Sequence, residues 1–314
     1  MTARTRVWAL HLAVLAVLFA GQNLLPAYHA NNLSRIMVLS VFAMGYNIAF
    51  GYTGLLSLGH ALFFAAGMYG AGLAILTVEW TALPALATGL VAGGAVAAAV
   101  GVLALRTAGV SFMIVTLMFA QAGYLVILYL GSVTGGDEGF VVEATGRKLF
   151  GADLASDGPR AVVAFALFSA ALMINLVLVR SPFGRVMVAM RENEERSRML
   201  GYNPFTVKLT VLVISGLFSG IAGAAYGILF GYVGASFATV QYSILPMLYV
   251  LMGGAGTVLG PLLGAGLMFY LVDITSGITT AYFMVVGVVL VVLVLFAPRG
   301  VLGAVRERWL KWLP

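Results

Sequence analysis

Small and polar residues interrupt an apolar stretch at positions 51–60, which reads GYTGLLSLGH. Inside a bilayer, irregular backbone survives only against protein or a water-filled cavity, and glycine-broken helices at membrane depth often build transport paths. Such a break offers hydrogen bonds to a small polar solute, but it supplies no acid, base or nucleophile. The pattern therefore favours passage of a solute, with the candidate residues Gly51, Thr53, Gly54, Ser57, Gly59 and His60. A tight turn between packed helices is the alternative, and for His60 a hydrogen-bonded packing role.

A second glycine-rich segment, LMGGAGTVLGPLLGAG at 251–266, has a similar glycine spacing. Broken hydrophobic elements in both halves of a chain are typical of transporters built from an internal duplication. We therefore add Gly253, Gly254 and Gly256 to the candidate path, with helix packing through small residues as the alternative. Gln121, a polar residue inside an otherwise apolar stretch, is a further candidate, and hydrogen bonding between helices is its alternative role.

The segment 181–205 carries the densest cluster of charges in the chain. Ser181–Pro182 predicts a helix start, Gly201 a helix stop, and Asn203–Pro204 the start of the next helix. Between them we expect a short amphipathic helix at 186–200, with Glu192–Arg196 and Glu194–Arg198 paired at i,i+4. Its predicted apolar stripe comprises Val186, Met187, Met190, Met199 and Leu200. A charged helix of this kind favours docking of a partner, and a solvated connector is the alternative.

Residues for catalysis, metal binding or nucleotide binding are missing. The chain has no cysteine, its three histidines are far apart, and no lysine follows a glycine, which excludes a G-x-x-x-x-G-K-[ST] phosphate loop. No predicted span carries a carboxylate or lysine near its centre, as a proton- or sodium-coupled carrier usually does. We therefore expect no enzyme and no bound cofactor, and we expect the energy for transport to come from outside this chain.

The composition predicts an all-α polytopic membrane protein. Hydrophobic residues make up 62% of the 314 positions and charged residues only 9%, too few to cover a soluble protein of this size. Glycine is abundant, with 39 residues, which is typical of closely packed membrane helices. The net charge of +6 reflects membrane topology rather than nucleic-acid binding, because the basic residues gather in loops.

About eight full spans are expected, since a span needs about 20 mostly apolar residues. They lie at 7–25, 33–51, 60–78, 83–105, 110–131, 160–179, 208–231 and 279–296. The first also resembles a signal peptide, but Tyr28 stands where a small residue is needed for cleavage before Asn31, so we expect an uncleaved span. Glycines and Pro261 break the apolar stretch 241–272, which predicts a re-entrant or half-helix pair folded at Gly253–Pro261.

The positive-inside rule orients these spans within a single transmembrane domain, 1–314. Arg4, Arg6, Arg106, the basic residues of loop 180–207 and the tail with Lys311 then face the cytoplasm, together with both chain termini. The loop 132–159, which collects five acidic residues, is external. The lipid bilayer is thus the first partner of the chain.

Four stretches resemble the LivM-type permease subunit of branched-chain amino-acid ABC importers. They are NIAFGYTGLLSLGHALFFAAGMY (47–69), FMIVTLMFAQ (112–121), SPFGRVMVAMRENEERSRMLGYNPFTVKL (181–209) and YVLMGGAGTVLGPLLGA (249–265). TGGDEG, 134–139, resembles the family's external TGG-x-x-G segment. The combination of GYTGLLSLGHALFF with RENEER is specific, whereas neither glycine run would be specific alone.

The resemblance implies a pore formed with a second homologous permease, two cytoplasmic ATPase subunits that bind the ATP, and an external or periplasmic substrate-binding protein. The ATPase-docking helix would correspond to 195–201, which reads E-R-S-R-M-L-G where such permeases often have E-A-A-x-x-x-G. Glu195 and Gly201 are kept, but both alanines are replaced. On those terms the coupling role extends to Arg191, Glu192, Glu194, Glu195, Arg198 and Gly201.

The expected function is inward passage of a small polar solute, most simply a branched-chain amino acid, across a bacterial inner membrane by alternating access. A urea or amide permease of the same family, and a carrier or channel that works alone, remain alternatives. So does a membrane scaffold that passes no solute.

Overall fold

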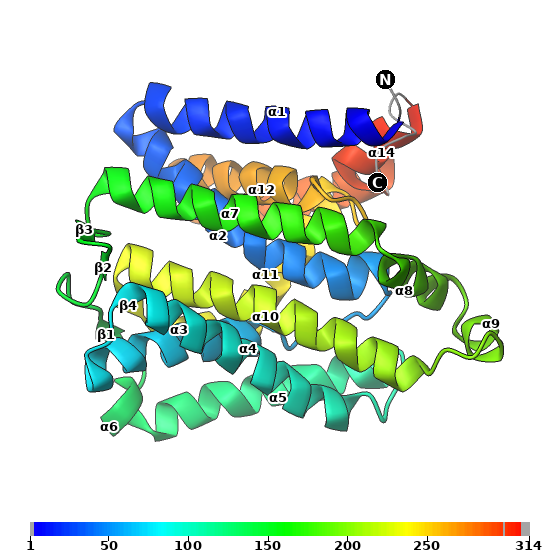
Figure 1. The fold of residues 1–314 in the computed structure, drawn as a ribbon, viewed down its shortest axis with the longest axis horizontal. Coiled ribbons are helices and arrows are strands. Elements are labelled where there is room, and N and C mark those ends of the chain that lie inside the picture. The colour runs from blue at the N-terminus through cyan, green and yellow to red at the C-terminus, as the bar shows by residue number, and fades with distance from the viewer. Residues whose placement is uncertain (1–2, 298, 309–314) are drawn as a thin grey trace.

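In the computed structural model, residues 3–297 and 299–308 are described, and they form a helical bundle (Figure 1). Seven of the described helices are long and apolar enough to cross a membrane. The expectation of an all-α, multi-pass membrane protein is confirmed. With their bounds, these helices are α1 Ala3–Leu24, α2 Ala27–Asn47 with its π-helical extension η1 Ile48–Tyr52, α3 His60–Val78, α4 Ala82–Ala104, α5 Val110–Tyr129, α7 Asp157–Arg180 and α10 Pro204–Phe230.

Three shorter apolar helices complete the bundle. The stretch predicted to be broken contains α11, Val240–Gly253, and α12, Gly260–Ser276, joined by residues 254–259. The eighth predicted span corresponds to α13, Tyr282–Phe296, whose 15 residues fall short of the about 20 that a full span needs. Helix α14, Gly300–Arg308, follows, and the predicted cytoplasmic Lys311 lies outside the described residues.

Helices α2 and α10 form the centre of the bundle. Both are mostly covered by other helices, whereas α1 and α5 are mostly exposed at the periphery. Helix α10 packs against α2, α3 and α4, and its contact with α4 depends on glycine. A Cβ added at Gly93 would lie 2.5 Å from the Cα of Gly220. Small residues at such crossings let two backbones approach, which is how helices associate in a membrane.

The two ends of the bundle differ in structure and charge. At one end lie α8, Pro182–Glu192, and α9, Glu194–Met199; we call this the α8–α9 end. The opposite, strand end holds α6, Gly131–Thr134, and two small antiparallel pairs. In these, β1 (Phe140–Val141) pairs with β4 (Tyr232–Val233), and β2 (Lys148–Leu149) pairs with β3 (Ala152–Asp153). The short η2, Ala235–Ala238, enters the bundle, where its Phe237 packs against Phe64 of α3.

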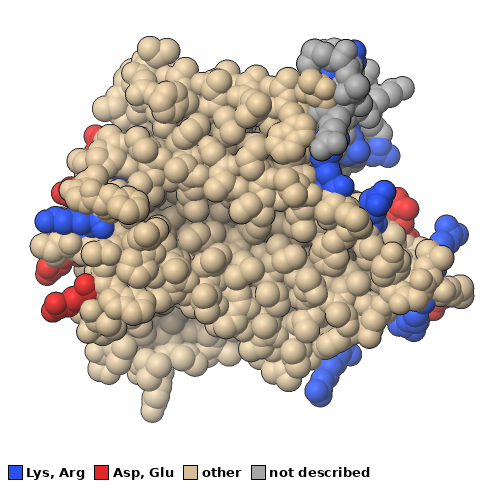
Figure 2. Space-filling model, viewed as in Figure 1, with Lys and Arg blue, Asp and Glu red and all other residues tan. Residues whose placement is uncertain are grey.

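Figure 2 shows charged side chains at both ends and an almost uncharged band between them, with Lys and Arg gathered at the α8–α9 end. The uncharged band fits the hydrocarbon core of a bilayer. The positive-inside rule predicts that the α8–α9 end faces the cytoplasm.

The loop 132–159 is fastened to the end of α10. Besides the β1–β4 pair, the Arg147 guanidinium donates a hydrogen bond of 2.8 Å to the Leu229 carbonyl, in the last turn of α10. A cation at this position neutralises the partial negative charge of a helix C-terminus. Burial, with the nearby charge of Arg160, lowers the pKa of Arg147. The loop is therefore a fixed part of the strand end.

Candidate functional site

The two glycine-broken segments lie against each other, and Asn47 joins them. Its amide Nδ2 donates to the Thr257 carbonyl at 2.9 Å, and its Oδ1 accepts from the Gly256 N–H at 2.9 Å. The side chain of Asn47 is fully buried at the end of α2, its hydrogen bond to Thr257 is buried and that from Gly256 is partly buried. Asn47 is not among the site residues predicted from the sequence. A signal for it exists, because a polar residue within an apolar helix must find hydrogen-bond partners.

The contact between the segments requires glycine on both sides. A Cβ added at Gly51 would lie 1.9 Å from Asn47 Oδ1 and 2.6 Å from the Gly256 nitrogen. Gly256 has a φ of +73°, in the left-handed region that favours glycine. The glycine spacing of the two segments thus serves a direct backbone contact between α2 and the α11–α12 turn.

Helix α8 reaches this contact through Arg191. Its Nη1 donates a hydrogen bond to the Gly51 carbonyl, and its aliphatic portion covers Gly54, where a Cβ would lie 3.2 Å from Arg191 Cγ. A Cβ at Gly256 would lie 3.3 Å from the same Nη1, so Arg191 links the charged loop to both broken segments. We call this group the junction: Asn47, Gly51, Gly54, Arg191 and Gly256.

Two adjacent cavities open beside the junction. One, of about 500 Å³, lies between residues 53–56, the α4–α5 turn and residues 190–194. The other, of about 610 Å³, extends from the α4–α5 turn to residues 198–208. Among their lining residues are the predicted Thr53, Gly54, Arg191, Glu192, Glu194, Arg198 and Gly201. Five of the six predicted coupling residues, all except Glu195, thus share one surface with the first broken segment at the α8–α9 end.

The expected single helix at 186–200 is wrong, because Asn193 divides it into α8 and α9. Asn193 has extended backbone (φ −159°, ψ 104°), and its Oδ1 accepts from the Arg196 N–H at 2.8 Å, which caps α9. The predicted boundaries around it are confirmed. Ser181 caps α8 by accepting from Gly184 N–H, Gly201 has a φ of +92°, and Asn203 caps α10.

The division of the helix also changes the predicted apolar stripe and charge pairs. Met187 and Met190 lie on the buried face of α8. Met199 and Leu200, at the end of α9, are 85% and 71% exposed. Among the described residues, Glu194 pairs with Lys208 of α10 at 2.5 Å, and neither predicted i,i+4 pair forms. Glu192 and Arg196 lie on different helices, which explains the loss of the first pair. Glu195 and Arg198 stay exposed on α9.

The remaining polar candidates at 53–60 are engaged within the protein. Thr53 donates to the Ile48 carbonyl at 3.1 Å, and Ser57 accepts from the Gly59 N–H at 3.1 Å. His60 is buried, with Nε2 2.7 Å from the Ser215 hydroxyl, which itself donates to the Gly45 carbonyl. Because that hydroxyl proton is committed, His60 donates to Ser215 and ties α3 to α10 and α2. This geometry favours the packing role of His60.

Two of the other candidate path residues, Gly253 and Gly254, lie in the α11–α12 turn, and the third, Gln121, lies on α5. A Cβ at Gly253 would lie 1.8 Å from the Gly260 carbonyl oxygen, and Gly254 has a φ of +125°. Both therefore shape the turn that meets Asn47. Gln121 lies apart, half-buried on α5, with no hydrogen bond among the described residues. It is not part of the junction.

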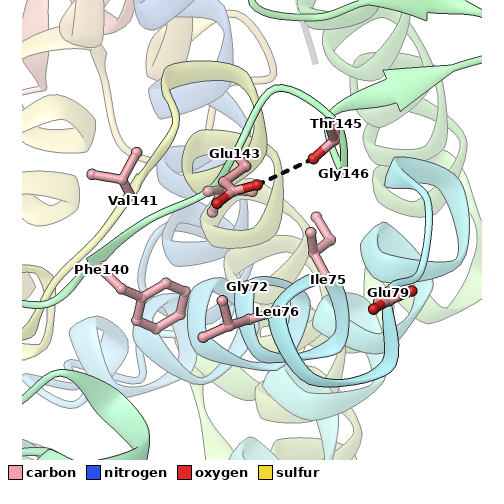
Figure 3. A pocket seen from close by; sticks show the side chains of 10 residues that line it. Gly72, Ile75, Leu76, Glu79, Phe140, Val141, Glu143, Thr145 and Gly146 are labelled. Atoms are coloured by element: carbon pink, nitrogen blue, oxygen red, sulfur yellow. Dashed lines mark hydrogen bonds between the residues drawn. The ribbon is translucent and has the colours of Figure 1, made fainter.

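A further cavity, of about 420 Å³, lies at the strand end and contains none of the predicted path residues. Figure 3 shows Glu79, at the end of α3, and Glu143, on the loop that passes above it. Thr145 donates to the Glu143 carboxylate at 3.4 Å. The cavity thus presents acidic groups at the face opposite to α8 and α9.

Comparison with known proteins identifies relatives along most of the chain. A family model described as "Branched-chain amino acid transport system / permease component" matches residues 28–295. The high-affinity branched-chain amino acid transport system permease protein LivM of Escherichia coli (strain K12) is 28% identical over 339 residues, which cover 98% of this chain and 77% of the relative. LivM of Salmonella typhimurium (strain LT2) is 27% identical with the same coverage.

A more local similarity extends to another kind of permease. The autoinducer 2 import system permease protein LsrC of Photorhabdus laumondii is 29% identical over 108 residues, 32% of this chain and 31% of the relative. No solved structure shows a significant match to the chain.

Proposed function

This chain belongs to the family of branched-chain amino acid transport system permease components, and from that premise we propose that it is the membrane-spanning subunit of an ATP-driven importer for branched-chain amino acids. In this proposal it works in a bacterial inner membrane with a second homologous permease, two cytoplasmic ATPase subunits and an external substrate-binding protein. ATP is bound and hydrolysed by the partners, and this chain carries no catalytic residue.

The observation that carries the proposal is the link from α9 and α8 to the junction. Helix α9 exposes Met199 and Leu200 next to charged Glu195 and Arg198 at the end of the bundle. An exposed apolar pair rimmed by charges is typical of a protein-binding surface. The neighbouring α8 is seated by buried Met187 and Met190 and contacts Gly51 through Arg191. A partner that binds α9 can therefore move α8 and, through Arg191, displace the broken segments.

Such a displacement supports alternating access. Gly51 continues into the mostly buried α2, and Gly256 joins α11 to α12, so movement at the junction tilts α2, α11 and α12 together. Rocking of helix groups around a solute path is the general mechanism of membrane transporters. The cavities at the α8–α9 end provide room for Arg191 and the α4–α5 turn to shift.

The proposal is tested by reversing charge on α9 in the assembled transporter. We expect Glu194→Lys/Glu195→Lys to abolish ATP-driven uptake of radiolabelled leucine and to reduce copurification of the ATPase subunits, with membrane insertion unchanged. Glu143→Lys, at the strand end, is the control and should retain the ATPase. Normal uptake by the double variant would refute the docking role. Leucine flux through the chain reconstituted alone would support a carrier that needs no partner.

A further inference from the structure

Arg35 occupies an unusual position in α2. It lies eight residues after Ala27, so its Cα is about 12 Å along the helix from the first residue of the span. It is the one exposed residue between His29 and Thr53, a stretch that is otherwise buried or half-buried. Its guanidinium lies against Phe230, the last residue of α10, so Arg35 is at the strand end of the bundle.

Nothing in the described part of the chain neutralises the charge of Arg35. It forms no hydrogen bond and no ion pair there, and its one specific contact is with the Phe230 ring, 5.0 Å from the ring centre. The Arg160 guanidinium lies 5.9 Å from the same ring, and Asp157 already pairs with Arg160. Two guanidinium groups therefore lie close to Phe230, and the carboxylate of Asp157 is paired with one of them. Asp273, the acidic group on the other side, accepts a hydrogen bond of 2.6 Å from the Tyr28 hydroxyl. Arg35 is thus left without a direct anionic partner among the described residues.

An aromatic cluster lies directly inward of Arg35, formed by Phe42, Phe64, Tyr226, Phe230, Phe237 and Tyr242. Phe42 and Phe64 are fully buried and form its base. Tyr226, Phe237 and Tyr242 are only partly buried. Neither the Tyr226 nor the Tyr242 hydroxyl makes a hydrogen bond among the described residues, so both can donate to a ligand.

We propose that Arg35 and this aromatic cluster form a contact site for an aliphatic amino acid on its way inward, in which Arg35 binds the α-carboxylate and the aromatic rings contact the side chain. The inference rests on the proposed function and adds the contacts that receive the substrate. A guanidinium fits a carboxylate through two parallel hydrogen bonds. The site lies at the strand end of α2 and α10, away from the junction, so a substrate can meet it before the α8–α9 end opens.

The test uses the assembled importer with Arg35→Cys, since the chain has no other cysteine. Loss of a charge-assisted contact should lower leucine uptake at least about tenfold, while ATP hydrolysis stimulated by the binding protein is retained. Treatment with 2-aminoethyl methanethiosulfonate restores a cation at position 35 and should recover part of the uptake. The 2-sulfonatoethyl reagent adds an anion and should not. The wild-type complex, treated in parallel, controls for thiols on the other subunits.

Arg35→Lys is the second variant, and its uptake should lie between those of Arg35→Cys and wild type, because it keeps the cation but loses the paired hydrogen bonds. Uptake by Arg35→Cys close to wild type would overturn the inference, as would equal effects of the two reagents. Equal effects would mean that position 35 is structural or faces a lipid headgroup. A wild-type complex that imports no amino acid would instead refute the proposed function, which keeps the two failures distinct.

Discussion

Asn47 shows how a single side chain can hold two distant segments together. Its partners, Gly256 and Thr257, lie 209 and 210 residues away in the sequence, and both hydrogen bonds are buried or partly buried. Removing one partner of a buried hydrogen bond leaves the other group without water or protein to replace it. The side chain thus stabilises the α2 contact with the α11–α12 turn more than its size suggests.

We therefore expect Asn47→Ala to lower the stability of the protein by about 1–3 kcal/mol, because the Gly256 N–H and the Thr257 carbonyl lose their partner. Thermal unfolding in detergent measures the effect. Asn23→Ala is the control, since Asn23 makes its one hydrogen bond, to Phe19, at an exposed position. Equal unfolding temperatures for Asn47→Ala and wild type would contradict the assignment.

Gly51 gives a second prediction at the same contact. In Gly51→Ala the new methyl group would overlap Asn47 Oδ1 and the Gly256 backbone, so we expect a loss of about 1–3 kcal/mol and impaired uptake. Gly158→Ala is the matched control, because nothing lies within 4 Å of a Cβ there. If both variants unfold and transport alike, the close approach of the two segments is not required.

The sequence could predict which residues break the helices but not what they contact. The glycines at 51, 54 and 256 are visible as interruptions of apolar runs, and the structure places all three in the junction. Their partners come from helices far apart in the chain, and packing alone decides such contacts. Gln121 illustrates the reverse case, since a polar residue in a span predicts a hydrogen-bond partner and none lies within 3–297 or 299–308.

At the scale of elements, the structure confirms the predicted helix boundaries at both ends of the charged segment 181–205. The single helix predicted between them is instead divided into α8 and α9. Ser181, Gly201 and Asn203 act as local signals, and local signals can be read from sequence. Asn193 followed by Glu194 and Glu195 is also such a signal, namely a capping residue with acidic residues in the first turn. The amphipathic pattern across 186–200 favoured one continuous helix over this signal. Glu194 forms its ion pair with Lys208, which lies outside the segment.

Arg191 is expected to transmit movement of α8 to the broken segments. Arg191→Ala should leave the complex assembled and hydrolysing ATP, but the amount of leucine imported per ATP should fall severalfold, because α8 loses its contact with Gly51. Combined uptake and hydrolysis assays measure this ratio. Arg185→Ala, an exposed arginine of the same helix, should keep the ratio. A parallel fall of hydrolysis and uptake in Arg191→Ala would instead indicate a docking role.

At the scale of the whole molecule, the spans could be read from sequence because hydrocarbon thickness dictates a minimum apolar length. The predicted span 160–179 is observed at Asp157–Arg180, and 83–105 at Ala82–Ala104. Residues 241–272 had to return to the side they left if the basic tail is inside, and α11 and α12 turn at the α8–α9 end, beside Asn47. The central position of α2 and α10 could not be predicted, since their hydropathy is similar to that of peripheral helices.

We predict that the α8–α9 end of the bundle faces the cytoplasm and the strand end faces outward. Because the sequence contains no cysteine, labelling of single introduced cysteines tests this orientation. Single cysteines are introduced as Glu195→Cys on α9 and Thr145→Cys on the loop 132–159, both at exposed positions. In intact cells a membrane-impermeant maleimide should label position 145 and not position 195, because the basic α8–α9 end is retained in the cytoplasm. Inverted membrane vesicles stripped of the ATPase subunits should reverse the pattern.

Labelling in intact cells and in inverted vesicles is compared for the same two cysteines. A cysteine that reacts in one preparation is expressed and accessible, so its lack of reaction in the other is not due to poor expression or to a buried thiol. A position that is labelled in one orientation is accessible, so its protection in the other reports the membrane barrier. Labelling of position 195 in intact cells would place α9 outside, where no ATP-hydrolysing partner can reach it. The link from α9 through Arg191 to Gly51 would then have no source of energy, and the transport mechanism built on the junction would fail with it.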